Sequence, residues 1–296
     1  MSCLVAAVLL AASGARASVT IQGAAPARPA KPLVFPGLIV ELATSDNWKL
    51  KAKYNPAKTG RKSFLLLHGT GGRKEDWYHL VRPLFRRGYG YLALDLRGHG
   101  ESRTAPDGTA AIWRKFVVSK NYNEYLNMVS DLEAGMAYLA AQGVAEEDIV
   151  IIGADVGGSI GLRYAALHPK VAMVALLSPG MKYQDVTTVN AMRAYKGRPI
   201  FMMYSEADKT SARETPILAS FARMAVGDKN LTVVAAPREH GAKMLRGPMI
   251  GKVFDWILQP VPSEAAVSTD AASGSVSLSS APANPAEEAD DADWMD

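Results

Sequence analysis

The chain has 296 residues, of which 48% are apolar, enough to bury a sizeable core in one large domain or two small ones. Its formal charge of +4 is unevenly spread, because residues 261–296 hold eight acidic and no basic residues. The only cysteine is Cys3. A thiol nucleophile or a disulfide framework in the rest of the chain is therefore excluded.

The first seventeen residues resemble a secretory signal peptide. Leu4–Ala12 is a short apolar stretch, and Ala15-Arg16-Ala17 is a small-x-small cleavage signal, although no Lys or Arg precedes the apolar stretch. About nine apolar residues are too few to span a bilayer, so no stable membrane anchor is expected. The pattern favours an exported protein, periplasmic or extracellular, over a disordered N-terminus that happens to be apolar. Residues 18–36 are rich in Ala and Pro and predict a linker.

Strand-like and helix-like segments alternate from residue 37 to 260, which predicts a single domain. The predicted strands cover residues 38–42, 48–54, 63–67, 91–94, 149–152, 171–177, 200–204 and 231–235. The predicted helices cover residues 76–87, 123–141, 156–167, 211–224 and 243–258. Short apolar strands that alternate with helices predict an α/β fold, with a mostly parallel eight-stranded sheet and helices on both faces.

Residues 261–296 consist mainly of Ala, Ser, Pro, Glu and Asp. Such a composition buries too little apolar surface to offset its ordering entropy, which predicts a disordered acidic tail. Residues 1–260 then carry a formal charge of about +12. Because no clustered Lys/Arg run accompanies this charge, it indicates a solvated surface and no nucleic-acid partner.

One motif stands at the end of the predicted strand 149–152. Gly153-Ala154-Asp155-Val156-Gly157-Gly158 continues directly into an Ala-rich helical segment, which is typical of a nucleophile elbow. Only small side chains fit around so tight a turn, and its tip residue stands at the carboxyl edge of the sheet. The usual tip residue is serine, whereas here it is Asp155. A second interpretation makes Asp155 only the N-cap of the following helix.

Three more signals follow predicted strands, at the sheet edge where open parallel sheets bind ligands. The glycines of His68-Gly69-Thr70-Gly71-Gly72 would let backbone N–H groups hold a developing oxyanion. Asp95–Ser102 follows the next strand. The last two strands are followed by Asp208 and by His240.

In this order, the motifs together resemble the α/β-hydrolase superfamily over roughly residues 38–258. Asp95–Ser102 is among the more recognisable marks of that superfamily. The resemblance implies the chain order nucleophile, acid, histidine, which falls on Asp155, Asp208 and His240. It also implies an oxyanion hole made by the backbone N–H groups of Thr70 and Val156. Within the superfamily, the chain is most similar to compact esterases of the dienelactone-hydrolase type.

The aspartate at the elbow is similar to that of epoxide hydrolases and haloalkane dehalogenases. In such relatives a carboxylate attacks saturated carbon, and a His-activated water cleaves the resulting ester. The chain departs from them in two ways. It has Val156 where they usually carry an aromatic residue, and residues 178–198 leave no room for a large cap domain.

Two functional hypotheses follow. The first is a cofactor-independent hydrolase with an Asp155–His240–Asp208 triad, which acts on a small, mostly apolar ester, epoxide or alkyl halide and binds no metal. The second is a catalytically inactive, hydrolase-like binding or scaffold protein. The partner in the first case is a small-molecule substrate, and the oligomeric state stays open.

Other residues near the predicted site are assigned supporting roles. His68 is expected to orient the loop 68–72, called the oxyanion loop below, His99 to hold the turn 95–102, and Glu206 to be the fallback for Asp208. Ser159 lies a full turn into the helix, too far to replace the nucleophile. The connection 103–122 carries Trp113 and Phe116, which either form a small lid over the pocket or pack on the sheet.

Overall fold

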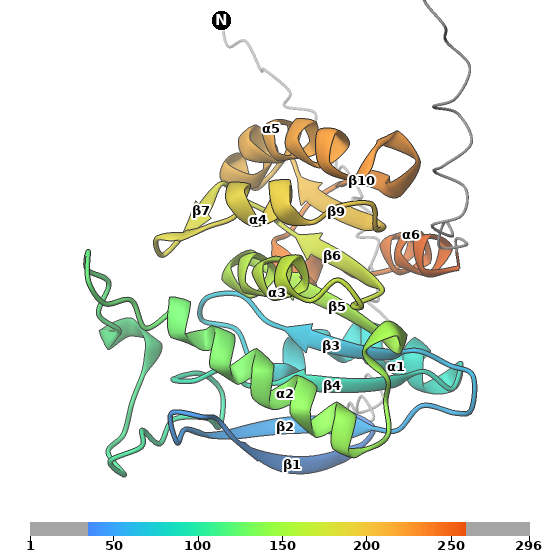
Figure 1. The fold of residues 1–296 in the computed structure, drawn as a ribbon. Helices are drawn as coiled ribbons and strands as arrows, with labels where there is room; N and C mark the ends of the chain where they lie inside the picture. Colours follow the sequence, from blue (N-terminus) through green and yellow to red (C-terminus); the bar gives the residue numbers. More distant parts are fainter. Residues whose placement is uncertain (1–34, 259–296) are drawn as a thin grey trace, which may run out of the picture. The chain divides into compact units, whose positions relative to one another are not determined.

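The computed structural model describes residues 35–258 (Figure 1). The predicted signal peptide, nearly all of the predicted linker and the predicted acidic tail lie outside these residues, so export and the role of the tail stay predictions.

An eight-stranded sheet lies at the centre of the described residues, in the order β1-β2-β4-β3-β5-β6-β9-β10 (Figure 1). Only β2 runs antiparallel to its neighbours. The strands are β1 (Leu38–Ala43), β2 (Lys49–Asn55), β3 (Ser63–Leu67), β4 (Gly90–Leu94), β5 (Ile149–Ala154), β6 (Met173–Leu177), β9 (Ile200–Ser205) and β10 (Leu231–Ala236). The eight predicted strands and the mostly parallel sheet are confirmed.

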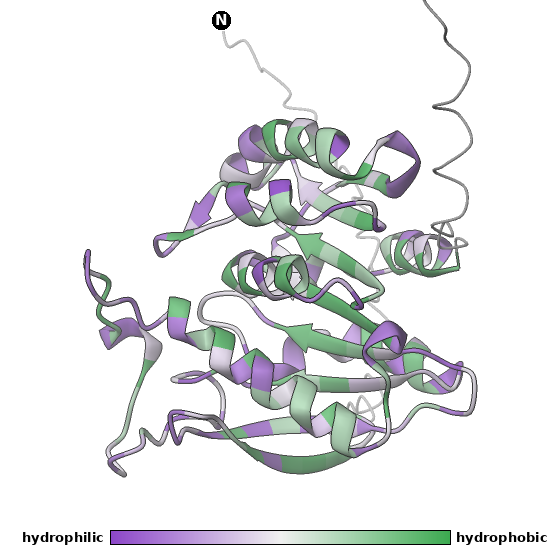
Figure 2. Cartoon of the chain, viewed as in Figure 1, coloured by the Kyte–Doolittle hydropathy of each residue, from purple (hydrophilic) through white to green (hydrophobic). Residues whose placement is uncertain are grey.

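Alternate residues of the buried strands feed two separate hydrophobic cores. In β3, Phe64 and Leu66 belong to one core and Leu65 and Leu67 to the other, because successive side chains of a strand point to opposite faces. The central strands are accordingly apolar along their length (Figure 2). A strand buried on both faces has no polar face, which explains why these segments are continuous apolar runs.

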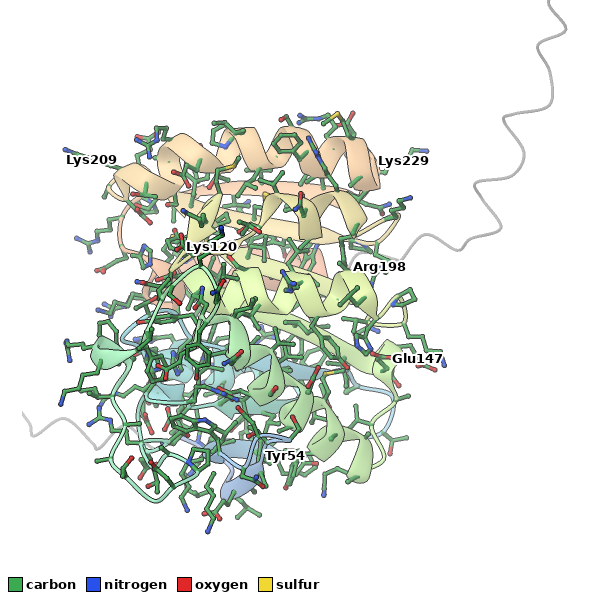
Figure 3. All side chains as sticks on the ribbon, turned by 60° about the vertical axis from the view of Figure 1, so that its left-hand side comes forward. Tyr54, Lys120, Glu147, Arg198, Lys209 and Lys229 are labelled. Atoms are coloured by element: carbon green, nitrogen blue, oxygen red, sulfur yellow. The ribbon has the colours of Figure 1, made fainter. Side chains whose placement is uncertain are left out.

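Within residues 35–258, six α-helices cover the two faces of the sheet. The helices are α1 (Tyr78–Arg86), α2 (Val129–Ala141), α3 (Asp155–Leu167), α4 (Val189–Ala194), α5 (Lys209–Val226) and α6 (Pro248–Ile257). Helices α1 and α6 supply side chains to one core, whereas α2, α3, α4 and α5 supply the other. Lys209 and Lys229 mark the two ends of the region formed by α5 and the turn after it (Figure 3). None of the helices in residues 35–258 is both long and apolar enough to cross a membrane.

Three helices begin later than predicted, each for a local reason. Helices α1 and α2 follow 3₁₀ turns, η1 (Lys74–Trp77) and η3 (Leu126–Met128), which share the helical apolar pattern. Helix α6 begins at Pro248, since Gly247 before it has a φ of +51° and breaks the helical path from the turn η6 (Gly241–Met244).

The connection from β6 to β9 is short, as predicted. It holds a two-stranded hairpin, β7 (Lys182–Tyr183) and β8 (Val186–Thr187), followed by the six-residue helix α4. No cap domain is inserted here. The hairpin itself was missed, because Gln184 and Asp185 turn it with φ values of +48° and +59° and without a glycine.

Candidate active site

Asp155 stands at the tip of the turn between β5 and α3, and its φ of +52° places it in the left-handed region. Small neighbours are required there. A Cβ atom on Gly157 would lie 2.4 Å from the carbonyl oxygen of His68, and one on Gly153 would lie 2.5 Å from the backbone of Gly158. The glycines therefore allow β3, β5 and α3 to pack closely around the tip of the turn. The left-handed φ of Asp155 is a strained backbone conformation, and such strain is concentrated at functional sites.

The carboxylate of Asp155 accepts two backbone hydrogen bonds. Its Oδ1 accepts from the N–H of Val156, and its Oδ2 accepts from the N–H of Thr70 at 3.2 Å. These are the two N–H groups expected to form the oxyanion hole. The carboxylate does not cap α3 in the usual way, since Ala154 is the N-cap residue and no side chain there bonds to the first turn. The N-cap interpretation of Asp155 thus has no support in this geometry.

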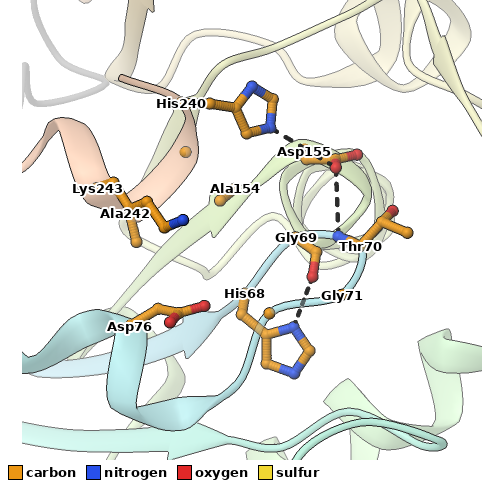
Figure 4. A pocket seen from close by; sticks show the side chains of 12 residues that line it. His68, Gly69, Thr70, Gly71, Asp76, Ala154, Asp155, His240, Ala242 and Lys243 are labelled. Carbon is orange, nitrogen blue, oxygen red and sulfur yellow. Dashed lines mark hydrogen bonds and ion pairs between the residues drawn. The ribbon is translucent and has the colours of Figure 1, made fainter. Parts of the chain in front are cut away.

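His240 lies between the two aspartates, after β10. Its Nδ1 is 2.5 Å from Oδ2 of Asp208, and its Nε2 is 3.8 Å from Oδ2 of Asp155 (Figure 4 shows the second pair). The contact with Asp208 is a hydrogen bond, whereas 3.8 Å is a contact between charges with no direct hydrogen bond. The side chain of His240 is 47% exposed, so water reaches the imidazole.

The electrostatics of His240 follow from these neighbours. The carboxylate of Asp155 is the largest cause that raises its pKa, burial opposes this, and Asp208 adds to the rise. Burial alone would raise the pKa of Asp208, but hydrogen bonds from Ser211 and His240 outweigh it and lower that pKa. Asp208 is therefore an ionised acceptor that holds Nδ1–H and orients the ring.

His68 supports the oxyanion loop from below. It is fully buried, its Nε2 accepts from the N–H of Leu96 at 3.0 Å, and its Nδ1 is 2.8 Å from the carbonyl oxygen of Gly69. Since Nε2 is an acceptor, the proton is on Nδ1 and is donated to Gly69. Burial lowers the pKa of His68 to about 4, so the ring stays neutral and keeps its two hydrogen bonds to the backbone of Gly69 and Leu96.

A cavity of about 200 Å³ opens in front of Asp155 (Figure 4). Its walls include His68, Thr70, Asp155 and His240, all predicted site residues. They also include Asp76 and Lys243, which the sequence analysis missed. Lys243 lies on the turn η6, its amine is turned toward the cavity, and it forms no ion pair within residues 35–258.

Neither Trp113 nor Phe116 lines this cavity, so a lid formed by these two residues stays a prediction. Trp113 stacks on the ring of His99 at 5.6 Å, and Phe116 packs edge-on against Trp48 and Tyr125. These aromatic side chains therefore pack behind the oxyanion loop.

The remaining candidate residues named in the sequence analysis lie outside the cavity. Asp95 accepts from the backbone N–H of both Lys74 and Glu101 and pairs with the ammonium of Lys74 at 2.7 Å, so it fixes the loop after β4. Ser159 is buried, and its hydroxyl oxygen lies 2.9 Å from that of Thr188. Asp208, and not the exposed Glu206, is the partner of His240.

Within the described part of the chain, no group of three or more His, Cys, Asp or Glu side chains is arranged to hold a metal ion.

A family model of the alpha/beta hydrolase fold matches residues 62–239, and this region carries the oxyanion loop, the elbow and Asp208. The chain belongs to the α/β-hydrolase fold family. By that membership it is a hydrolase.

Solved structures similar to this hydrolase include the Pyrococcus furiosus esterase Pf2001, with a TM-score of 0.59 and 19% identity over 76% of this chain and 93% of that one. Dienelactone hydrolase from Anabaena variabilis has a TM-score of 0.55 and 15% identity over 75% of this chain and 94% of that one. At these identities the likeness shows the fold alone.

One curated relative is the dihydrolipoyllysine-residue acetyltransferase component of the acetoin cleaving system of Cupriavidus necator. It is 28% identical to this hydrolase over 131 residues, which are 44% of this chain and 30% of that protein. The match thus spans less than a third of the relative's length.

The glycines of the elbow give a prediction on stability. Gly157→Ala in this hydrolase is expected to lower the free energy of unfolding by about 2–3 kcal/mol, because the new methyl group meets backbone atoms that cannot rotate away. Chemical denaturation measures the change. Gly251→Ala in α6 is the control, since its Cβ has nothing within 4 Å and should stabilise by up to about 1 kcal/mol. Equal effects of the two substitutions would contradict the prediction.

Proposed function

We propose that this protein hydrolyses small alkyl electrophiles, alkyl halides or epoxides, by way of an ester on Asp155, without a cofactor. One observation carries the proposal. The N–H groups of Thr70 and Val156 already bind the oxygens of Asp155. A substrate carbonyl would find both donors occupied, which disfavours direct attack on an ester. Attack at saturated carbon needs no oxyanion hole in its first step.

In the first step, an oxygen of the Asp155 carboxylate attacks the carbon that bears the leaving group. The new C–O bond forms as the carbon–halogen or the epoxide C–O bond breaks, and the leaving atom departs with the electron pair. An epoxide oxygen then takes a proton from water. Oδ2 is the better placed oxygen, because it lies between Thr70 and His240 on the walls of the cavity.

In the second step, His240 Nε2 takes a proton from a water molecule whose oxygen attacks Cγ of the Asp155 ester. The negative charge that develops on Oδ1, the oxygen that does not carry the alkyl group, is stabilised by the N–H group of Val156, which already donates to it. The tetrahedral intermediate then expels the alkoxide, which receives the proton from His240, and Asp155, left as the carboxylic acid, releases its proton to solvent. Asp208 keeps Nδ1 protonated and stabilises the imidazolium.

The charge of Asp155 would set the pKa of His240 differently in the two steps. In the free enzyme its carboxylate is the largest cause of the raised pKa of His240. Esterification removes this negative charge, so the pKa of His240 falls once the intermediate has formed. The imidazole then loses its proton and becomes a base at the step that needs one.

Oxygen isotope labelling tests the proposal. A single turnover of styrene oxide or 1-bromobutane in H₂¹⁸O should place ¹⁸O in the carboxylate of Asp155 and leave the first product molecule unlabelled, as read by peptide mass spectrometry. Label in the product without label in Asp155 would show direct attack by water. If epoxides, halides and esters all remain unchanged, the inactive binding protein is the better account.

The pH dependence gives a second prediction. In the free enzyme, NMR titration should place the pKa of His240 above the ordinary histidine value of about 6.5, because His240 lies beside two carboxylates. The ascending limb of kcat, with hydrolysis of the ester limiting, should lie at lower pH than this pKa, because the ester carries no charge. Asp208→Asn should lower both values, whereas Glu206→Gln, on the same strand end, should shift neither. A limb of kcat that coincides with the pKa of His240 in the free enzyme would contradict the change of charge at Asp155.

Lys243 is assigned to the leaving group. Its ammonium lines the cavity, faces it, and is without an ion pair among residues 35–258, so it can stabilise an anion that leaves the substrate. Lys243→Met keeps the length of the side chain and removes the charge. We expect the first step, measured by rapid mixing, to slow by roughly 10-fold, and ester hydrolysis to change little. A loss confined to the second step would contradict this role.

A further inference from the structure

A second cavity, of about 340 Å³, lies between α1 and α6, on the sheet face opposite to α2 and α3. We call it the α1–α6 groove. Arg82 and Arg86 from α1, and Arg87 directly after it, line the groove together with Ile250 and Phe254 from α6. The groove thus combines three guanidinium groups with apolar side chains.

The positive charge of the groove is not neutralised. Within residues 35–258, no carboxylate forms an ion pair with any of the three arginines. Arg87 lies over the ring of Phe254 at 4.3 Å, and Arg82 lies over Tyr78 at 5.5 Å. The pKa of His79, at the same groove, is lowered by burial and by the charges of Arg246 and Arg82. The surroundings are therefore positive and favour an anionic occupant.

One segment of the sequence has the chemistry expected of an occupant of the groove. Residues 287–296, Glu-Glu-Ala-Asp-Asp-Ala-Asp-Trp-Met-Asp, hold six acidic residues, no basic residue, and the apolar pair Trp294-Met295. This segment lies outside the described residues. It follows Leu258, one turn beyond Phe254 of the groove, after 28 intervening residues. A chain of that length reaches roughly 30 Å on average, enough to bring it back over α6.

We propose that the acidic segment 287–296 binds the α1–α6 groove of its own chain. Its carboxylates pair with Arg82 and Arg86, and its Trp-Met pair packs on Ile250. Because the segment is tethered, its effective concentration is on the order of millimolar, and weak contacts suffice to keep it bound. The contact weakens as the salt concentration rises, since the ion pairs lie at the surface.

A labelled synthetic peptide of residues 287–296 tests this by fluorescence anisotropy. The receptor is the full chain in which the six acidic residues of that segment are replaced by Gln or Asn. We expect the peptide to bind this neutralised chain, to bind the unmodified chain at least 10-fold more weakly, and to lose affinity with added NaCl. The unmodified chain binds less because its own segment competes.

Matched variants locate the contact. In the neutralised chain, Arg82→Gln with Arg86→Gln should weaken peptide binding at least 10-fold, and both positions are exposed enough to leave the fold intact, as thermal melting would verify. Lys170→Gln with Lys229→Gln removes the same charge from exposed positions elsewhere and should change little.

Three results would overturn the proposal. Equal peptide affinity for the neutralised and unmodified chains would make the groove a site for an external acidic partner. No binding to the neutralised chain would remove the site itself. Light scattering that shows a dimer of the unmodified chain, dissociated by neutralising the segment, would place the segment on a second copy.

Discussion

Asp155→Asn is expected to abolish turnover of epoxides and alkyl halides, by at least about 10⁴-fold. The amide of asparagine has nearly the shape of the carboxylate, but it lacks the charged oxygen that forms the new C–O bond. Asparagine also tolerates the left-handed backbone that position 155 requires, with its φ of +52°, so the fold should persist. Steady-state rates and a thermal melt of the same preparation measure the two effects separately.

The companion substitution Asp155→Ser separates the nucleophile from its surroundings. Serine leaves the N–H groups of Thr70 and Val156 without the carboxylate that they now bind. Esterase activity on p-nitrophenyl acetate should therefore appear, with His240 as the base. Substantial turnover by Asp155→Asn, or an unchanged profile in both variants, would show that residue 155 is not the nucleophile.

His240→Gln is expected to allow the first step, formation of the ester, and to block its hydrolysis. The first step needs no base, since the carboxylate is already charged, so one equivalent of leaving group should be released per site. Hydrolysis of the ester should then fall by at least about 10³-fold, because no group removes the proton from water. Rapid mixing measures the burst, and intact mass spectrometry detects the alkyl group retained on the protein.

This result discriminates between nucleophiles. In a serine hydrolase the loss of histidine slows the first step as well as the second, and no burst appears. Glu206→Gln is the control, because it removes a carboxylate close to Asp208 that does not contact His240. A variant His240→Gln that turns over steadily, or one that releases no leaving group at all, would contradict the proposed sequence of steps.

The sheet could be predicted from the sequence because its central strands are buried on both faces and are therefore uninterrupted apolar runs. Parallel strands place their carboxyl ends at one edge, which is why Asp155, Asp208 and His240 could be assigned to a common site. The contact of 3.8 Å between Asp155 and His240 depends on the tight elbow that Gly153 and Gly157 permit.

The rest of the site depended on loops. Lys243 was predicted to begin a helix, whereas it lies in the turn η6, ahead of the break at Gly247, and lines the cavity. Trp113 was equally compatible with a lid or with packing, because aromatic residues serve both purposes. Its stacking on His99 depends on the path of residues 103–122, which no periodic pattern specifies.

The half-exposed imidazole of His240 has a kinetic consequence. Solvent reaches the imidazole at the rim of the cavity, and the short connection from β6 to β9 contains no cap domain that would have to open between the steps of the proposed cycle. The chemical steps then limit the rate of the cycle, so added viscogens such as glycerol should leave kcat largely unaltered.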